Sequence, residues 1–323
     1  MIETPRLRIA AIGFLNPAPL MWDFEHPPLQ NPLALRYQID RMLPSECAAH
    51  LASGAADIGL IPIAALATTP GLRILPGCTI ASKGRVRSLL LVRRAAQRLH
   101  ALRSVAADMA SRTTLAHARI LFRQWGNPDV PFLPAVADLD SMLQRADAAI
   151  LIGDPALLAL EERANRFERT GEELVYHDLA AEWHTLTGLP FVSAVWAAAP
   201  HNSAGAPGSG SPRTGLSPWG GDAGSPRTGL SPWGGDLDSE TWESIAEDFI
   251  QSRDHGLQNI DALVAEWSGR IAIPEQTIRA YLTTNIHYVL DEECLEAMKV
   301  FFRMAAQAGA LPEYSFSMSE TAI

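Results

Sequence analysis

Residues Phe14-Leu15-Asn16-Pro17-Ala18-Pro19-Leu20 follow directly on the apolar run of residues 7–12. An apolar run, a loop of small residues and prolines, and then an amphipathic segment predict a strand, a tight loop and a helix. In such a unit the loop points its backbone N–H groups and polar side chains over the edge of a sheet, where ligands collect. Asn16 is the strongly hydrogen-bonding side chain of this loop. We expect it either to contact a ligand or to cap the helix that begins near Pro17.

The alternation of strands and helices continues outward from this loop. We predict strands at 7–14, 33–39 and 57–61, with helices at 20–24 and 45–52. After a strand at 88–93 a second series follows. Its strands are expected at 105–109, 132–135, 148–152 and 174–177, and its helices at 115–124, 139–145, 156–166 and 179–184. This order is typical of βαβ units and predicts parallel sheets covered on both faces.

The chain is expected to form two α/β lobes. A strand at 191–198 would return it to the first lobe, which helices at 242–253, 260–268, 274–288 and 292–308 would complete. We therefore assign residues 1–92 and 196–323 to the first lobe and residues 93–195 to the second. Two crossings between lobes make a hinge, with a ligand cleft between them.

Composition excludes several classes of function. The 323 residues carry a formal net charge of −10, whereas nucleic acids and anionic membranes require clustered Lys and Arg. The uncharged apolar stretch at residues 58–72 contains two prolines and is shorter than the roughly 20 apolar residues of a membrane span. No signal peptide is visible, and the three cysteines are far apart, which indicates reduced thiols in a cytoplasmic protein. They are Cys47, Cys78 and Cys294.

Residues 201–238 differ in character from the rest. The segment GSPRTGLSPWGGD at 210–222 recurs identically at 224–236. Segments so rich in Gly, Ser and Pro do not form a packed core, and two copies are too few for a solenoid. We interpret this stretch as an inserted flexible tandem repeat.

Deleting residues 205–236 is therefore expected to leave fold and activity nearly unchanged. Such a segment contributes little buried surface, and loop closure depends only weakly on length. Thermal melting of the deletion variant tests this. A melting temperature lower by more than about 5 °C would contradict the prediction and show that the repeat packs on the body.

Three further segments carry motifs: SKGRVRS at 82–88, LIGDPAL at 151–157 and WHTLTGLPFV at 183–192. With the loop at 14–20, they resemble, in the same order, the signature segments of chorismate dehydratase, which begins the futalosine route to menaquinone. The resemblance runs from residue 7 to about 199 and resumes at about 241. Each motif is weak alone, but four in order are specific. Phe14 replaces a Tyr of the family pattern, and Pro17 replaces a Thr.

The resemblance implies a type II periplasmic-binding-protein-like fold, no cofactor or metal, and chorismate as ligand. Chorismate is a dianion, so it requires local anion sites. Arg side chains, hydroxyl groups and helix N-termini supply these. The implied substrate-binding residues are Ser82, Arg87, Ser88, Ser111, Thr113, Gly153 and Asp154.

Local structure offers alternatives for several of these residues. Ser111 and Thr113 are equally typical of a helix cap, and Asp154, which precedes Pro155, is typical of a helix N-cap. Arg112 is equally consistent with a solvated surface position.

The implied catalytic residue is Asn16. Removing the C3 proton and the C4 hydroxyl makes the chorismate ring aromatic, so the barrier lies in proton removal and leaving-group departure. The matched segments at 14–20, 82–88 and 151–157 contain no His. Our hypothesis is that the enolpyruvyl carboxylate of the substrate takes the proton, while Asn16 binds the departing oxygen or orients that carboxylate.

Two other classes compete with this reading. A sister enzyme of the same fold forms dihydroxynaphthoate, but it is less similar at residues 82–88, and its chemistry calls for a His in a strand-end loop. A non-enzymatic receptor or sensor would be expected to carry an export signal or a fused signalling domain. The sequence shows neither.

Overall fold

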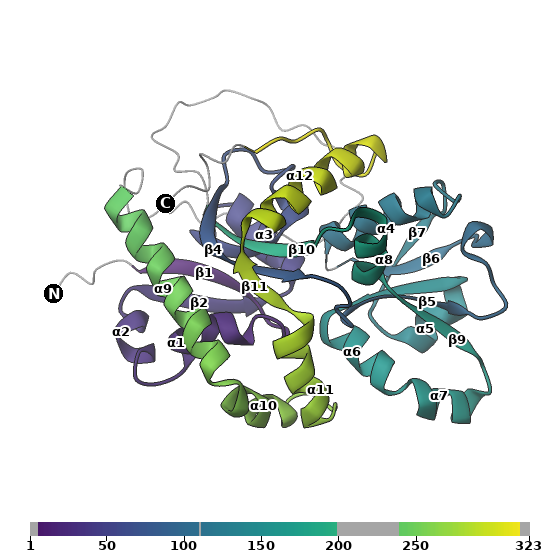
Figure 1. Cartoon of the computed structure of the whole chain (residues 1–323), viewed down its shortest axis with the longest axis horizontal. Helices are drawn as coiled ribbons and strands as arrows, with labels where there is room; N and C mark the ends of the chain where they lie inside the picture. Colours follow the sequence, from purple (N-terminus) through teal and green to yellow (C-terminus); the bar gives the residue numbers. More distant parts are fainter. Residues whose placement is uncertain (1–5, 110, 199–238, 317–323) are drawn as a thin grey trace.

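The computed structural model describes residues 6–109, 111–198 and 239–316. The predicted repeat at 201–238 lies outside these residues. Two sheets form two lobes that lie side by side along the long axis of the molecule (Figure 1). The prediction of a two-lobed α/β protein is therefore confirmed.

The first sheet has the strand order β11-β4-β10-β3-β1-β2. β1 is parallel to β2 and β3, whereas β10 runs antiparallel between β3 and β4. The sheet is thus mixed rather than wholly parallel, because β10 enters it from the opposite lobe. The strands are β1 Leu7–Ile12, β2 Tyr37–Met42, β3 Ile58–Pro62, β4 Arg73–Ser82, β10 Phe191–Ala198 and β11 His287–Leu290.

The second sheet has the order β7-β6-β8-β5-β9, with β5 antiparallel to both of its neighbours. Its strands are β5 Leu89–Arg94, β6 Val105–Asp108, β7 Phe132–Ala135, β8 Ala148–Ile152 and β9 Leu174–Asp178. Its helices are the short η3 Leu99–Ala101, α4 Arg112–Gln124, α5 Leu139–Arg145, α6 Gly153–Glu161, α7 Arg163–Thr170 and α8 Leu179–Thr187.

The first lobe is covered by helices from both ends of the chain, and α9 runs along it next to α1 (Figure 1). Before β10 these helices are η1 Ala18–Met21, α1 Trp22–Glu25, α2 Gln30–Ala34, α3 Pro44–Ala52 and η2 Ile63–Ala65. After it come α9 Ser239–Gln258, α10 Ile260–Ser268, α11 Glu275–Ala280, a π-helical turn Tyr281–Asn285 and α12 Glu292–Gln307.

The predicted elements differ from the structure at residues 33–39 and 274–288, and the strand at 73–82 was not predicted. The strand expected at 33–39 is the end of α2 followed by β2, and Leu35 between them is 76% exposed. The helix expected at 274–288 ends in the π-helical turn, after which β11 pairs with β4. β4 itself was missed, because Pro76 and Gly77 interrupt its apolar pattern.

The two crossings between lobes differ by a few residues from those expected. β5 belongs to the second sheet and β10 to the first, so the boundaries proposed at 92/93 and 195/196 fall inside strands. The chain passes between lobes at 83–88 and at 188–190. Both crossings coincide with motifs singled out in the sequence.

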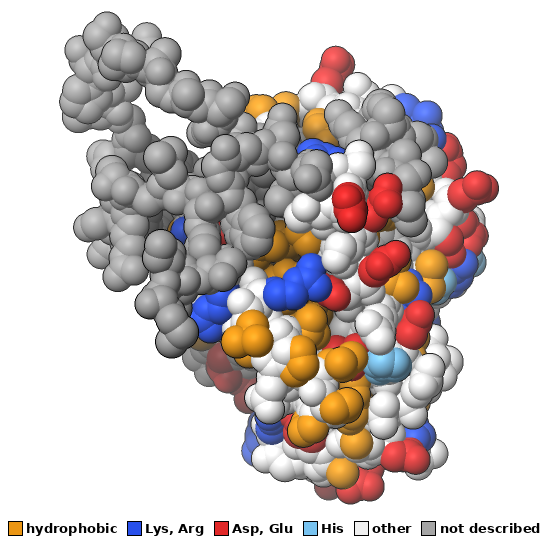
Figure 2. All heavy atoms as spheres, turned by 90° about the vertical axis from the view of Figure 1, so that its left-hand side faces the viewer, with side chains coloured by type: hydrophobic (Ala, Val, Ile, Leu, Met, Phe, Trp, Pro, Cys, Tyr) orange, Lys and Arg blue, Asp and Glu red, His pale blue; other side chains and the backbone are white. Residues whose placement is uncertain are grey.

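The surface agrees with the charge pattern of the sequence. On the first-lobe face shown in Figure 2, acidic and basic side chains are scattered among apolar and uncharged ones. Such a face is not the clustered basic surface that nucleic acids require. Within the described residues, no helix is both long and apolar enough to cross a bilayer.

Candidate functional site

The loop after β1 places Asn16 at the junction of the lobes. The short helix η1 starts after Pro17 without a side-chain cap, so Asn16 does not act as its cap. The Asn16 side chain is half-buried, and its Oδ1 atom is buried without a hydrogen-bond partner among the described residues. An unpaired buried carbonyl oxygen is uncommon and calls for an explanation, such as a ligand that it faces.

Helix α9 contacts the chain just after this loop and fixes its backbone. The Ser252 hydroxyl donates to the carbonyl of Leu20 at 2.9 Å and accepts the N–H of Asp23 at 3.0 Å. A Cβ on Gly256 would lie 2.0 Å from the carbonyl oxygen of Pro19, so only glycine permits this close approach. The backbone around Asn16 is therefore fixed by contacts made more than 200 residues away in the chain.

Residues of the second lobe meet the same loop. Gly153 has φ +62°, and a Cβ there would lie 2.6 Å from the ring of Phe14. Next to it, the Asp154 carboxylate accepts the backbone N–H of Leu15 at 3.0 Å. The Leu15 peptide immediately precedes Asn16, so Asp154 fixes the position of the residue predicted to be catalytic.

The environment of Asp154 makes it an unusual carboxyl group. Burial raises the pKa of Asp154 to about 6, and the hydrogen bond from Leu15 only partly offsets this. The group therefore titrates in the range where a general acid or base operates.

The segment at 82–88 is held by Asp178, a residue that the sequence reasoning missed. The Asp178 carboxylate accepts the N–H of Arg87 at 2.7 Å, that of Val86 at 3.0 Å, and that of Ala181, so it also caps α8. Burial raises the pKa of Asp178, and these three donors act in the opposite direction. An Asp directly before a predicted helix was the available signal, but its link to residues 86–87 is visible only in the structure.

Ser82 and Ser88 are both buried. The Ser82 hydroxyl donates to the carbonyl of Gly84 at 3.3 Å. The Ser88 hydroxyl accepts from the phenol of Tyr281 at 2.7 Å, and the Ser88 carbonyl accepts the N–H of Gly153 at 2.9 Å. Ser88 thus connects the first lobe to the start of α6, which carries Asp154. No motif in the sequence pointed to Tyr281.

Arg87 has a left-handed backbone with φ +67°, which is uncommon for a non-glycine residue. Its Nη2 atom contacts Glu161 Oε1 at 2.5 Å, and its Nε atom is buried without a partner among the described residues. Strained backbone and an incompletely paired guanidinium are typical of functional positions. In this structure, however, the carboxylate that pairs with Arg87 belongs to the protein residue Glu161 and not to a ligand.

We expect Arg87→Lys to weaken the binding of chorismate, the ligand that the motif resemblance implies, by about tenfold, because Lys keeps the charge but loses the paired donors of the guanidinium. Glu161→Gln is the matched control, since it removes the observed ion pair and leaves Arg87 in place. Titration calorimetry and thermal melting of both variants separate the two roles. Unchanged affinity in Arg87→Lys, with equal loss of stability in both variants, would assign Arg87 to structure.

Ser111 and Thr113 have local or inter-lobe partners. Ser111 is the N-cap of α4, where its hydroxyl accepts the N–H of Thr114 at 3.3 Å. The buried Thr113 hydroxyl accepts the N–H of Ala64 from the first lobe at 3.0 Å. Arg112 is exposed. Capping is therefore the observed contact of Ser111, while Thr113 joins the lobes.

One turn after Thr113 on α4, His117 is fully buried. Its ring stacks on Phe191 at 4.1 Å and meets the edge of Trp183 at 5.5 Å. Neither ring nitrogen has a hydrogen-bond partner among the described residues, and burial lowers the pKa of His117 to about 3. A histidine so hard to protonate is a poor general base at neutral pH. The position of His117 close to Thr113 therefore does not favour a mechanism in which a histidine accepts the substrate proton.

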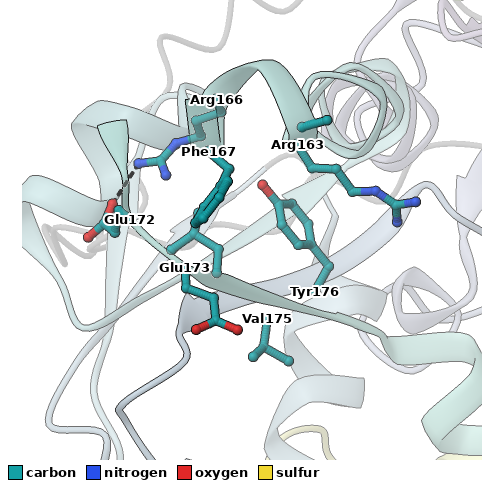
Figure 3. A pocket seen from close by; sticks show the side chains of 9 residues that line it. Arg163, Arg166, Phe167, Glu172, Glu173, Val175 and Tyr176 are labelled. Carbon is teal, nitrogen blue, oxygen red and sulfur yellow. Dashed lines mark hydrogen bonds and ion pairs between the residues drawn. The ribbon is translucent and has the colours of Figure 1, made fainter. Parts of the chain in front are cut away.

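The structure thus brings together four predicted site residues, Asn16, Ser88, Gly153 and Asp154. Asp154 accepts the N–H of Leu15, the neighbour of Asn16, and the Ser88 carbonyl accepts the N–H of Gly153. Thr113 forms a further hydrogen bond between the lobes. A separate surface groove of about 580 Å³ lies between α7 and β9 (Figure 3). None of the predicted site residues lines it, and its buried cation, Arg166, already pairs with Asp140 and Glu172. The candidate site is therefore the inter-lobe junction rather than this groove.

Comparison with solved structures defines the class of fold. The model resembles protein AF1704 from Archaeoglobus fulgidus, with a TM-score of 0.64 at 14% identity, covering 95% of this chain and 98% of that one. It also resembles the alkanesulfonate-binding protein SsuA from Xanthomonas axonopodis pv. citri bound to MOPS, with a TM-score of 0.59 at 14% identity over 100% and 99% of the chains. The periplasmic aliphatic sulphonate binding protein SsuA from Escherichia coli gives 0.57 at 13% identity over 94% and 86%.

The fold is accordingly a two-lobed type II periplasmic-binding-protein-like fold, as the sequence predicted. The model of a family described as menaquinone biosynthesis matches residues 7–206 and 229–307. Because this match covers most of the chain, the protein belongs to the menaquinone biosynthesis family. The resemblance drawn from the four motifs is confirmed at the level of this family.

Proposed function

We propose that this protein dehydrates chorismate to 3-[(1-carboxyvinyl)oxy]benzoate in menaquinone biosynthesis by the futalosine route, as a cytoplasmic enzyme. Membership of the menaquinone biosynthesis family and the four motifs support this choice. The observation that carries it is the unpaired, buried Oδ1 atom of Asn16, beside a backbone that Asp154 holds from the opposite lobe. A polar group left unpaired at a lobe junction suits a ligand that supplies the missing partner.

In the proposed reaction, the C3 proton leaves chorismate, the C4 hydroxyl departs as water, and the ring becomes aromatic. The enolpyruvyl carboxylate of the substrate accepts the C3 proton and passes it to the departing C4 oxygen, so that the hydroxyl leaves as water without a further proton donor. Asn16 binds the departing oxygen or orients that carboxylate, and its fixed position means that little reorganisation accompanies the step. The candidates that hold the two carboxylates of the substrate are Arg87, Ser88 and Ser82, together with Ser111 and Thr113 at the start of α4.

Asp154 takes a positioning role in this proposal. At neutral pH a carboxyl group with a pKa of about 6 is mostly ionised, and a negative charge would repel a dianionic substrate. Its observed partner is the N–H of Leu15, which sets the orientation of the Asn16 peptide. The ring of Phe14 lies close to Gly153 of the opposite lobe, and we infer that the lobes part and close again during turnover.

Incubating the purified protein with chorismate tests the proposal. We expect loss of the cyclohexadiene absorbance and one product lighter by one water, identified by mass spectrometry. Binding of chorismate without conversion would instead indicate a binding protein. Neither binding nor conversion would point to the sister activity, which acts on another substrate, and would overturn the proposal.

A further inference from the structure

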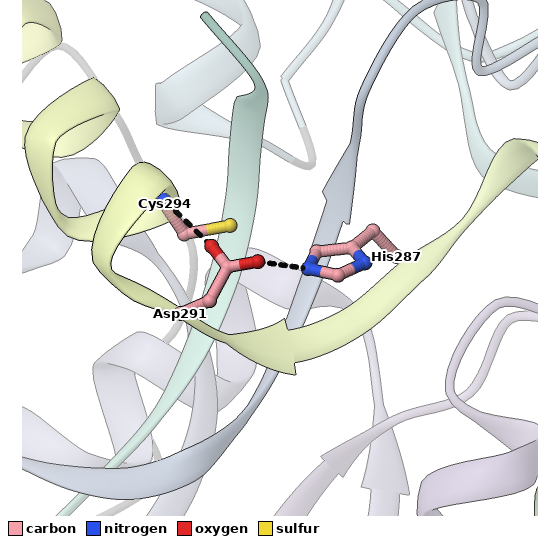
Figure 4. Close-up of side chains that lie close together, drawn as sticks. All are labelled: His287, Asp291 and Cys294. Atoms are coloured by element: carbon pink, nitrogen blue, oxygen red, sulfur yellow. Dashed lines mark hydrogen bonds and ion pairs between the residues drawn. The ribbon is translucent and has the colours of Figure 1, made fainter.

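The turn between β11 and α12 gathers three side chains with different ligand atoms (Figure 4). His287 projects from β11, Asp291 is the N-cap of α12, and Cys294 lies in its first turn. The His287 Nε2 atom lies 2.8 Å from Asp291 Oδ2. The imidazole nitrogen, a carboxylate oxygen and the thiol sulfur all lie within 4.8 Å of one another.

Helix capping explains only part of this arrangement. The cap uses Asp291 Oδ1, which accepts the Cys294 N–H at 2.9 Å. The other oxygen, Oδ2, is not used by the cap and faces His287. The Cys294 sulfur contacts the carbonyl of Val289 at 3.7 Å and lies on the same side of the Asp291 carboxylate as His287. The side chains of His287 and Asp291 are 25% and 30% exposed, so solvent reaches these two groups, while the Cys294 side chain is buried beneath them.

We propose that His287, Asp291 and Cys294 form a binding site for a borderline-soft divalent cation such as Zn²⁺. Imidazole, thiolate and carboxylate are the ligands that Zn²⁺ takes in proteins, and three protein ligands leave a fourth position for water. Binding would release the thiol proton to solvent, since a coordinated thiol is deprotonated.

Lys83 competes for the same carboxylate. Its Nζ atom lies 3.0 Å from Asp291 Oδ2 and 2.8 Å from Glu293 Oε2. Lys83 belongs to the segment at 83–88 that connects the two lobes. A cation at Asp291 would displace the ammonium group and free one anchor of that connection, so the site would couple metal binding to the contact between the lobes.

Cobalt titration of the untagged, reduced protein tests the site, because Co²⁺ occupies zinc sites and reports thiolate ligands by a charge-transfer band in the near ultraviolet. We expect one equivalent to bind with this band. Cys294→Ser should abolish the band, whereas Cys78→Ser, at another buried thiol, should leave it intact. Lys83→Met should tighten Co²⁺ binding by at least about fivefold, because it removes the competing charge.

Absence of the band at saturating Co²⁺, its persistence in Cys294→Ser, or unchanged affinity in Lys83→Met would each overturn the proposal. Thermal melting of each variant confirms that it is folded. None of the three ligands forms a hydrogen bond with Asn16, Ser88 or Asp154, so the cobalt band reports on the metal site whether or not the protein dehydrates chorismate.

Discussion

Asn16→Ala is expected to lower the turnover of chorismate on the order of 10²-fold or more, which corresponds to about 3 kcal/mol of barrier. The groups that grip the substrate carboxylates remain, so binding should change far less than turnover. Stability should not fall, because Asn16 caps no helix and its buried Oδ1 has no partner to lose. Removing an unsatisfied buried carbonyl oxygen is neutral or stabilising.

Asn127→Ala is a matched control for this variant. The Asn127 amide donates to the carbonyls of Leu99 and Leu102 in the second lobe, at 3.1 and 2.8 Å. Its loss should lower the melting temperature and leave turnover per folded molecule unchanged. If Asn16→Ala keeps turnover within a few-fold of the parent, Asn16 is a turn residue and the proposed mechanism fails.

Two substitutions at Asp154 are expected to affect turnover to different extents. Asp154→Ala removes the acceptor for the Leu15 N–H and should lower turnover at least about tenfold, because the Asn16 peptide is then released. Asp154→Asn keeps an acceptor oxygen, so turnover should stay within a few-fold of the parent at pH 7. If Asp154→Asn is as inactive as Asp154→Ala, then Asp154 exchanges a proton with the substrate itself and is not a positioning residue.

The same residue should give stability a distinct pH dependence. The folded-state pKa of Asp154, about 6, lies above the ordinary value of 3.8, so between these values the folded protein holds a proton that the unfolded chain has released. Stability from this group is therefore present below about pH 4 and is lost as the pH rises through about 6, by up to about 2–3 kcal/mol.

Denaturant unfolding of the parent and of Asp154→Asn from pH 4 to 7 gives the free energy of unfolding as a function of pH. The contribution of Asp154 is the difference between the slopes of the two proteins. Burial also raises the pKa values of Asp178 and Asp248, so the variant should keep part of the slope. Identical slopes in the two proteins would show that Asp154 is not perturbed by burial.

Local signals in the sequence were sufficient where an element is continuous and bounded by polar or turn residues. The bounds of β7, β8, β10, α5 and α10 are those predicted, because each is a short periodic segment with clear ends. Pattern failed where an element is interrupted, as in β4 with Pro76 and Gly77. It failed again at β11, where a helical pattern runs into a strand through a π-helical turn.

The sequence also located the segments of the candidate site, since their order and spacing carry the family resemblance. It did not reveal the partners of their side chains. The bonds from Leu15 to Asp154 and from Val86 and Arg87 to Asp178 join residues about 90 to 140 positions apart. No local pattern encodes such pairs, because they depend on how two lobes dock.

The sequence by itself therefore determined the two-lobed α/β class, the family and the loops at the lobe junction, all of which follow from local periodicity and from motifs. Only the tertiary structure decided that Asn16 caps no helix and that its Oδ1 atom has no partner among the described residues. It also decided that Arg87 pairs with Glu161 and that Asp154 is buried against Leu15. The physical reason is that burial and long-range hydrogen bonds are properties of the packed chain, and they set the charge state and position of each group.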